Sequence, residues 1–289
     1  MKKITMFFAM VAMTCLTACG GSSSGEASEG KEDSTERVDC SEKNRTVQWE
    51  ALKEGNATYL SEYQLFSSQC NPTKSPSNRG LAYDLSVPLF TDYATKYRFI
   101  FIPENTKAAY SSGEGTKLED GRELYVDDGV IDFPVGTVIV KTFSLPSDTS
   151  DRGFDKENLV ETRLLIHRTT GWKALPYVWN EDKTDAKLDF NGDSQQTSLT
   201  HNSEQLNFTY NVPDPQKCQR CHQIDGSGTQ PIGPKARYLN MDFTYADGTI
   251  KKRAIASESA FFNNFGPLWN QIITIPDNET YALGLNITG

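Results

Sequence analysis

Runs of residues typical of β-strands fill the middle of the chain, from residue 79 to residue 212. In these runs polar and apolar residues alternate, or β-branched and aromatic residues gather, as expected where successive side chains point to opposite faces of a sheet. Thr169-Thr170-Gly171 separates two of the runs and is typical of a hairpin turn. The sequence therefore predicts a mainly β domain over residues 40–212, a β-sandwich or a partly open barrel. The expected strands are 97–102, 129–143, 159–168, 172–179 and 206–212.

Less regular segments flank these strands. Residues 46–70 carry apolar side chains near helical spacing, interrupted at Gly55, and predict a short helical region. The polar segment 189–193 alternates carboxylate and amide side chains, but it lacks the later residues of a calcium loop and favours a hairpin turn. Residues 213–289 are of mixed character and form the expected C-terminal segment.

The first 39 residues have the organisation of an export signal followed by a tether. Lys2 and Lys3 precede a short apolar run, and small residues then lead to Cys19, so residues 1–18 are expected to be a signal peptide. Leu16-Thr17-Ala18-Cys19 resembles the bacterial lipobox, which implies acylation of Cys19; the alternative is an ordinary signal peptide with a chance cysteine. Residues 19–39 are rich in Gly, Ser and Glu and predict a flexible tether.

Charge and the residue after Cys19 bear on partners and location. The net charge of -9 and the pI of about 5.0 come without a cluster of Lys or Arg, which excludes nucleic acid as an expected partner. An acidic surface suits a basic redox partner. Gly20, rather than Asp, follows Cys19. By resemblance to lipoprotein sorting rules this favours the outer membrane, facing the periplasm or the cell surface.

Cys40 and Cys70 are the two cysteines with no other assigned role. In an oxidising compartment two such thiols are expected to form a disulfide. Closing a loop of about 30 residues would stabilise the domain by about 3 kcal/mol on the chain-entropy model. The alternative is a pair of free, buried thiols.

The pentapeptide Cys218-Gln219-Arg220-Cys221-His222 carries the chemistry of the chain. Two thiols at this spacing add across the two vinyl groups of one haem, and the following histidine is placed to bind its iron. We therefore expect one covalent haem c attached at Cys218 and Cys221, with His222 as the proximal ligand. A thioredoxin-like motif, a zinc site and a simple disulfide are the alternatives.

The sixth ligand of the iron has several candidates. Met241 lies nineteen residues after His222 and would raise the reduction potential as a thioether ligand. His167 is expected at a strand end before a hairpin turn, and His201 in a polar loop. An open sixth position is the remaining alternative.

Several longer motifs resemble a known family. The chain is similar to the di-haem c-type cytochrome lipoproteins of proteobacteria over about residues 60–245. That family has no assigned physiological role, and its members continue into a second domain with another Cys-X-X-Cys-His motif, which is absent before Gly289. The resemblance thus implies either a single-haem member or a shortened chain. It is carried by Tyr83-Asp84-Leu85, Pro88-Leu89-Phe90, Asp92-Tyr93-Ala94, segments 132–137, 141–143, 161–165 and 172–180, the haem motif and segment 231–237.

Together these features predict an exported, lipid-anchored cytochrome that transfers electrons and is not expected to be an enzyme. The alternatives are a haem peroxidase or oxygenase and a haem-based sensor of ligand or potential, both with an open sixth position. Four basic residues near the motif are candidates for contact with the haem propionates or with a partner, or for a solvated surface: Lys217, Arg220, Lys235 and Arg237.

Overall fold

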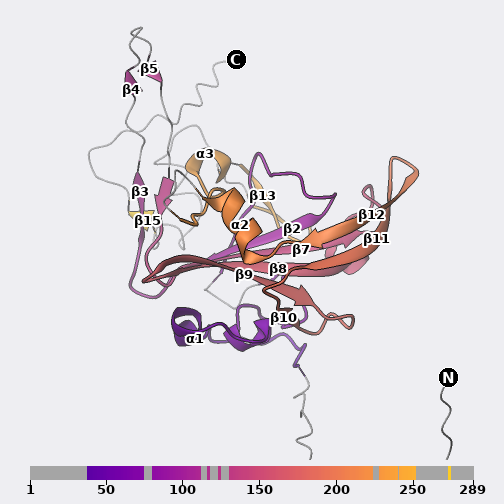
Figure 1. The fold of residues 1–289 in the computed structure, drawn as a ribbon, viewed down its shortest axis with the longest axis horizontal. Coiled ribbons are helices and arrows are strands. Elements are labelled where there is room, and N and C mark those ends of the chain that lie inside the picture. Colours follow the sequence, from indigo (N-terminus) through magenta and orange to yellow (C-terminus); the bar gives the residue numbers. More distant parts are fainter. Residues whose placement is uncertain are drawn as a thin grey trace, which may run out of the picture. The chain divides into compact units, whose positions relative to one another are not determined.

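A six-stranded antiparallel sheet is the largest element of the computed structural model (Figure 1). The structure describes residues 38–74, 80–111, 116–117, 123–124, 130–223, 228–239, 241–251 and 273–274. The strand order is β1-β2-β7-β8-β9-β10. The strands are β1 (Leu81–Ala82), β2 (Thr95–Phe101), β7 (Val138–Pro146), β8 (Glu157–Arg168), β9 (Gly171–Trp179) and β10 (Ala186–Leu188).

Smaller sheets and short helices complete the fold. A long hairpin is formed by β11 (Asp193–His201) and β12 (Glu204–Val212). The other strands are β3 (Ala108–Ser111), β4 (Thr116–Lys117), β5 (Glu123–Leu124), β6 (Val130–Asp132), β13 (Phe243–Thr244), β14 (Ile250–Lys251) and β15 (Ile273–Thr274). The helices are α1 (Trp49–Glu54), η1 (Leu60–Tyr63), η2 (Phe154–Lys156), α2 (Pro215–His222) and α3 (Ala236–Leu239). No helix among the described residues is long and apolar enough to cross a membrane.

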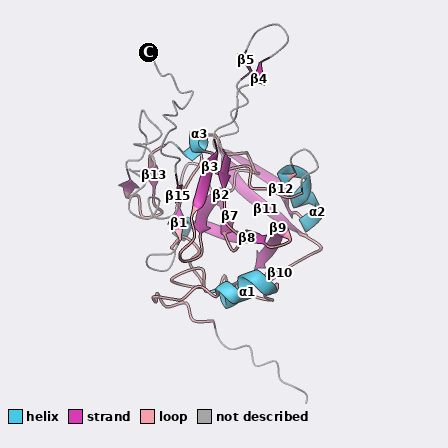
Figure 2. Cartoon of the chain, turned by 90° about the vertical axis from the view of Figure 1, so that its left-hand side faces the viewer, coloured by secondary structure: helices cyan, strands magenta, loops and turns pink. Residues whose placement is uncertain are grey.

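The expected fold class is confirmed. The protein is mainly β, its large sheet is antiparallel throughout, and the strands that the structure describes do not close into a barrel. Side chains alternate between the two faces of this sheet. Both faces are packed against other parts of the chain. Helices α1 and α2 lie on different sides of it (Figures 1 and 2).

One face, which we call the α1 face, packs against the N-terminal part of the described chain. Its strands contribute Phe99, Val140 and Leu164, which contact residues of α1 and η1 such as Leu52 and Tyr63. Arg168 closes the end of α1, since its Nε donates to the carbonyl oxygen of Leu52 at 3.0 Å. This apolar layer removes the α1 face from solvent and supplies the main hydrophobic core.

The opposite face, which we call the α2 face, is divided into three parts. An apolar group around Ile100, Ile139 and Leu165 packs with Leu239 of α3 at one end. The hairpin β11–β12 covers the other end through a cluster that includes Tyr210. Charged side chains occupy the part between these two apolar groups, where α2 packs against β9.

The strand expected over residues 129–143 is wrong as a single element. The structure has two strands there, β6 and the start of β7, which pair with different partners. Residues 133–137 separate them, and Gly136 has a φ of +95° that a continuing strand does not permit. The polar strand β11 was not expected at all, because its Gln, Ser and Thr side chains lack an apolar alternation.

A disulfide joins Cys40 to Cys70, which confirms the expected pairing. The two Cα atoms are 5.1 Å apart and 30 residues apart in the chain. The bridge ties the first described residues to the η1 region, where Ser68 Oγ also donates to the carbonyl oxygen of Cys40 at 2.7 Å. The signal peptide, Cys19 and nearly all of the tether lie outside the described residues, as do 252–272 and 275–289.

Candidate haem-attachment site

Helix α2 carries all three residues of the haem motif, and its start is fixed by the local sequence. The Asp214 carboxylate caps the helix by accepting from the backbone N–H of Lys217 at 2.9 Å. Pro215 follows at the first helical position, where no N–H is needed. The Pro213-Asp214-Pro215 sequence thus ends the hairpin strand β12 and begins α2, with two residues between the two elements.

The two motif cysteines lie three residues apart on α2, which places them on one side of the helix. Both thiols are free; Cys218 is buried and Cys221 is exposed. Burial raises the pKa of the Cys218 thiol. The motif therefore presents two free thiols one helical turn apart, one of them buried and the other exposed.

His222, the last residue of α2, is held by backbone groups. Its Nδ1 lies 2.9 Å from the carbonyl oxygen of Gln230, and the Gln230 N–H donates to the His222 carbonyl at 2.7 Å. An antiparallel bridge between Gln223 and Thr229 continues this pairing. A carbonyl can only accept, so the contact assigns the proton to Nδ1 and leaves a lone pair on Nε2.

Burial lowers the pKa of His222, opposed by the Gln230 contact and aided by the charges of Lys141 and Arg163. The imidazole is therefore neutral near pH 7, as metal binding requires. An Nδ1–H donated to a backbone carbonyl is also the usual support of a metal-binding histidine. His222 thus has the protonation state and the orientation of a ligand.

Three basic residues form a row across the α2 face. In the strand register Arg98 on β2 is opposite Lys141 on β7, and Lys141 is opposite Arg163 on β8. Directly opposite residues project on the same face, with Cβ atoms about 4.5–5.5 Å apart. We call these three residues the basic row. It lies next to the part of the sheet that α2 covers, since α2 packs on β9 and Arg163 is opposite Pro176 of β9.

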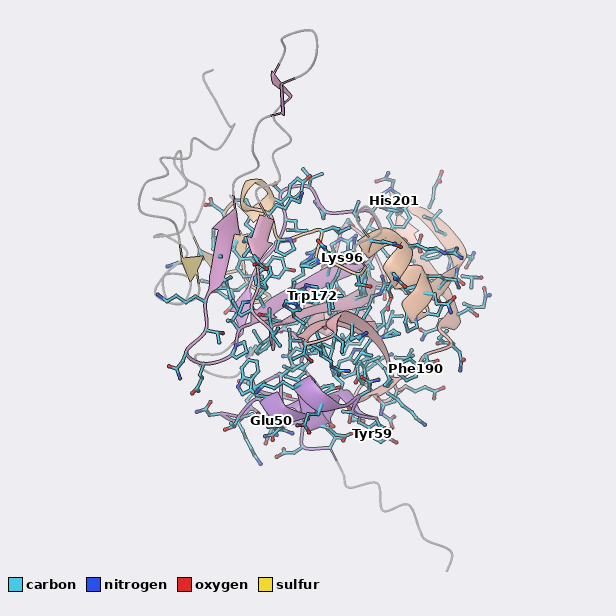
Figure 3. All side chains as sticks on the ribbon, turned by 60° about the vertical axis from the view of Figure 1, so that its left-hand side comes forward. Glu50, Tyr59, Lys96, Trp172, Phe190 and His201 are labelled. Atoms are coloured by element: carbon cyan, nitrogen blue, oxygen red, sulfur yellow. A yellow bond between two sulfur atoms is a disulfide. The ribbon has the colours of Figure 1, made fainter. Side chains whose placement is uncertain are left out.

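A fourth cation, Lys96, lies beside the basic row. All of this part of the face lies around the buried ring of Phe143. The Lys141 Nζ lies 5.0 Å from the centre of the Phe143 ring, and the Arg163 Cζ lies 4.3 Å from it. Lys96 Nζ is 6.0 Å from the same ring and donates to the carbonyl oxygen of Leu89. Figure 3 shows Lys96 on the side of the sheet away from Glu50 of α1. These cation–π contacts offset part of the repulsion.

Two carboxylates compensate two of the four cations. Asp84 accepts from Arg98 Nη1, and the fully buried Glu161 accepts from Arg163 Nε at 2.7 Å. Glu161 also accepts from the Tyr210 hydroxyl at 2.8 Å. Within the described part of the chain, Lys141 has no carboxylate partner, and the buried Nε of Arg98 has no hydrogen-bond partner. The row therefore carries excess positive charge and an unsatisfied donor.

The candidates for the sixth ligand are not equally free. His167 Nδ1 lies 2.7 Å from the Phe133 carbonyl oxygen, and its ring stacks on Trp172 at 4.6 Å, which leaves Nε2 with a lone pair. Met241 follows α3 and is half-buried. Its backbone N–H donates to the Leu239 carbonyl at 2.7 Å, and no hydrogen bond among the described residues joins it to α2.

His201 is at the end of strand β11, not in a loop as the sequence suggested. Both of its ring nitrogens are engaged: Nδ1 is 2.8 Å from Thr149 Oγ1, and Nε2 is 3.1 Å from the Asn202 side-chain amide. Its ring also contacts Tyr93 at 4.7 Å. Of the three candidates, His201 is therefore the least available to an iron.

The basic residues expected near the haem are less suited to it than the basic row. Lys217 is exposed and 3.4 Å from Asp214, and Arg220 is exposed. Lys235 is half-buried, and the side chain of Arg237 lies outside the described residues. The row was missed because its members are distant in the sequence and meet only through the register of β2, β7 and β8.

Taken together, the fold and site define a β-rich protein with a Cys-X-X-Cys-His helix packed on a charged sheet face. No known protein family, no curated protein and no solved structure matches the chain. The described residues contain no group of three or more His, Cys, Asp and Glu side chains that would hold a metal ion on its own. A haem iron needs no such group, because the porphyrin supplies four of its ligands.

Proposed function

We propose that the protein is an exported, lipid-anchored c-type cytochrome that transfers electrons through one covalent haem. The single observation that carries this proposal is the state of His222, which follows two free thiols on α2 and keeps Nε2 available through its Nδ1 contact with Gln230. Burial of the neutral imidazole adds to this. The other parts of the proposal, including acylation at Cys19 and an outer-membrane location, rest on the sequence.

The residues of the site suit a c-type haem. Cys218 and Cys221 would each add S–H across one vinyl group, so that the sulfur and the proton both end on the vinyl carbons and no oxidant is needed. His222 Nε2 would bind the iron. When bound, the group supplies a one-electron redox centre; the protein orients His222, buries one thioether and surrounds the site with charge.

In an electron-transfer cytochrome a protein side chain occupies the sixth position of the iron, so that no substrate binds there. The proposal therefore needs a sixth ligand from this chain. Met241 is our first candidate, because a thioether ligand is common in cytochromes c and raises the potential. His167 is the second, because its Nε2 carries a lone pair and it lies on the α2 face. Replacing Met241 by Leu, or His167 by Gln, changes a low-spin visible spectrum only if that residue is the ligand.

The test is to produce the full chain in a host that attaches haem c, and to measure its mass and its haem-stained gel. We expect the added mass of one haem on the wild type and none on the Cys218→Ala/Cys221→Ala variant. The Cys40→Ala/Cys70→Ala variant is the matched control and keeps the haem, since those thiols form a disulfide far from the motif in sequence. A wild type without haem would contradict the proposal.

The visible spectrum then separates electron transfer from the other haem functions. A low-spin haem that is unaffected by peroxide or cyanide supports electron transfer. A high-spin haem that turns over peroxide would contradict the electron-transfer function. His222→Ala should keep both thioethers but lose the low-spin spectrum, and His201→Ala should leave the spectrum unchanged. Labelling with a fatty-acid analogue, absent in Cys19→Ala, tests the anchor.

A further inference from the structure

We propose that the basic row, with Lys141 at its centre, binds the propionate carboxylates of the haem. This inference rests on the proposed function, because it requires a haem at α2. It names the side chains that would orient the haem, and they differ from the basic residues that flank the motif in the sequence.

The first support is the charge balance of the α2 face. Lys96, Arg98, Lys141 and Arg163 lie on one part of it, and among the described residues the carboxylates that form salt bridges with them are Asp84 and Glu161. Asp92 adds a negative charge that acts on Lys96 without a described salt bridge. Two further carboxylates, the number that one haem carries, would give partners to the cations that form no described salt bridge. The unpartnered Nε of Arg98 is a buried donor that an added carboxylate oxygen would satisfy.

The second support is the cost of the row without an anion. Like charges directly opposite each other on a sheet are destabilising, and here there are two such neighbours in succession, Arg98 with Lys141 and Lys141 with Arg163. Lys141 is only partly exposed, and its one described contact is with the Phe143 ring. A covered, repulsive row is readily explained if the folded protein gains an anionic ligand there.

The third support is the position of the row relative to the motif. Helix α2 packs on β9, which is the strand next to β8, and Arg163 is opposite Pro176 of β9. Helix α2, which carries Cys218 and His222, therefore lies over the strand that neighbours Arg163, on the same face of the sheet as the row.

The test compares variants of the haem-loaded protein. Lys141→Gln removes the central charge, Lys141→Arg keeps it, and Lys173→Gln is the matched control, because Lys173 is an exposed residue on the α1 face of β9. Haem content is first confirmed for each by mass. The readouts are the reduction potential as a function of pH and the propionate-bending band in resonance Raman spectra.

We expect Lys141→Gln to have a lower potential than the wild type, since losing a cation favours the more positive ferric state. Its potential should also fall more steeply with rising pH, because a propionate without its cation has a raised pKa and titrates nearer neutrality. The propionate band should shift in this variant alone. In the haem-loaded protein the propionates would keep Lys141 protonated across this pH range. Lys141→Arg should therefore match the wild type in all three readouts, and so should Lys173→Gln.

The outcomes separate the two proposals. If the wild type carries no haem, the proposed function is wrong, and the row has no propionate to bind. If haem is attached but Lys141→Gln matches Lys173→Gln in potential, pH dependence and propionate band, then propionate binding by the row is overturned while the haem assignment stands. A lowered potential with an unchanged pH dependence and band also overturns it, because that pattern shows only a distant charge.

Discussion

Lys141 and Arg163 are directly opposite partners on β7 and β8, so two cations lie side by side on a covered face of the sheet. Burial and the neighbouring charges of Arg98, Arg163 and Lys96 lower the pKa of Lys141 to about 7, and the charge of Glu161 opposes them. The charges of Lys141 and Arg163 also help to lower the pKa of His222 on α2. This relationship makes the haem-free protein sensitive to pH.

We expect Lys141→Met to stabilise the haem-free chain near pH 7. The unfolded lysine keeps a pKa of about 10.4 and binds a proton that the folded side chain binds weakly. The free-energy cost that the protonated Lys141 imposes on folding is therefore full below pH 7 and declines as the pH rises toward 10. The free energy of unfolding of the wild type accordingly increases with pH through this residue. In urea unfolding, the free energy of unfolding of Lys141→Met should exceed that of the wild type by more at pH 7 than at pH 9. Equal advantages at both pH values would be inconsistent with a titrating Lys141, and Lys173→Met is the control.

Glu161→Gln should destabilise the fold strongly, by about 3–5 kcal/mol, because it leaves the Arg163 guanidinium without its buried carboxylate. Glu157→Gln, on the same strand, is the comparison, since the Glu157 carboxylate accepts from hydroxyl groups such as those of Thr95 and Ser144. Glu157→Gln should lower the free energy of unfolding by less than Glu161→Gln does. Adding Lys141→Met to Glu161→Gln should restore part of the stability in chemical unfolding, and strict additivity would argue against coupling within the row.

Gly136→Ala should cost more than Gly171→Ala, although the two glycines have nearly equal φ angles of +95° and +94°. A Cβ at Gly136 would lie 2.6 Å from Pro103 Cγ, whereas a Cβ at Gly171 meets no atom within 4 Å. For Gly171→Ala we expect the free energy of unfolding to fall by about 1 kcal/mol, from the left-handed conformation alone. At Gly136 we expect at least about 2 kcal/mol, since overpacking is added. Thermal unfolding of both variants, measured together, decides this.

Cys40→Ala/Cys70→Ala should lower the free energy of unfolding by about 3 kcal/mol, because the unfolded chain is no longer restricted by a loop of 30 residues. Urea unfolding of the wild type with a reductant should approach the value for the variant. The variant itself should not respond to the reductant. A response there would mean that another disulfide contributes.

The sequence was a sound guide wherever a strand has an alternating or β-branched pattern, as in β8 and β9, and at the turn before Gly171. It failed where local conformation overrides the pattern: Gly136 breaks an apolar run into β6 and β7. It also failed at β11, whose polar residues are held by pairing with β12 and by the two positive φ angles of Asn202 and Ser203. Pairing of this kind depends on a partner strand, so a window of local sequence does not contain it.

For the candidate site, the motif on α2 could be read directly, because Cys218, Cys221 and His222 are neighbours in the chain. The support of His222 could not, since the Gln230 carbonyl reaches it only through a short backbone pairing. The basic row was equally hidden: Arg98, Lys141 and Arg163 belong to three different strands. Each sits in an ordinary strand pattern, and only the register reveals that they are neighbours.

The bridge between Cys40 and Cys70 also determines how the protein responds to mechanical load. A pull applied at residue 38 enters the folded part at Cys40 and passes through the sulfur atoms to Cys70, so that residues 41–69 carry none of the tension. That shielded segment contains α1 and η1, which cover one face of the sheet. The core layer would therefore stay in place under a force that, without the covalent link, would peel it away first.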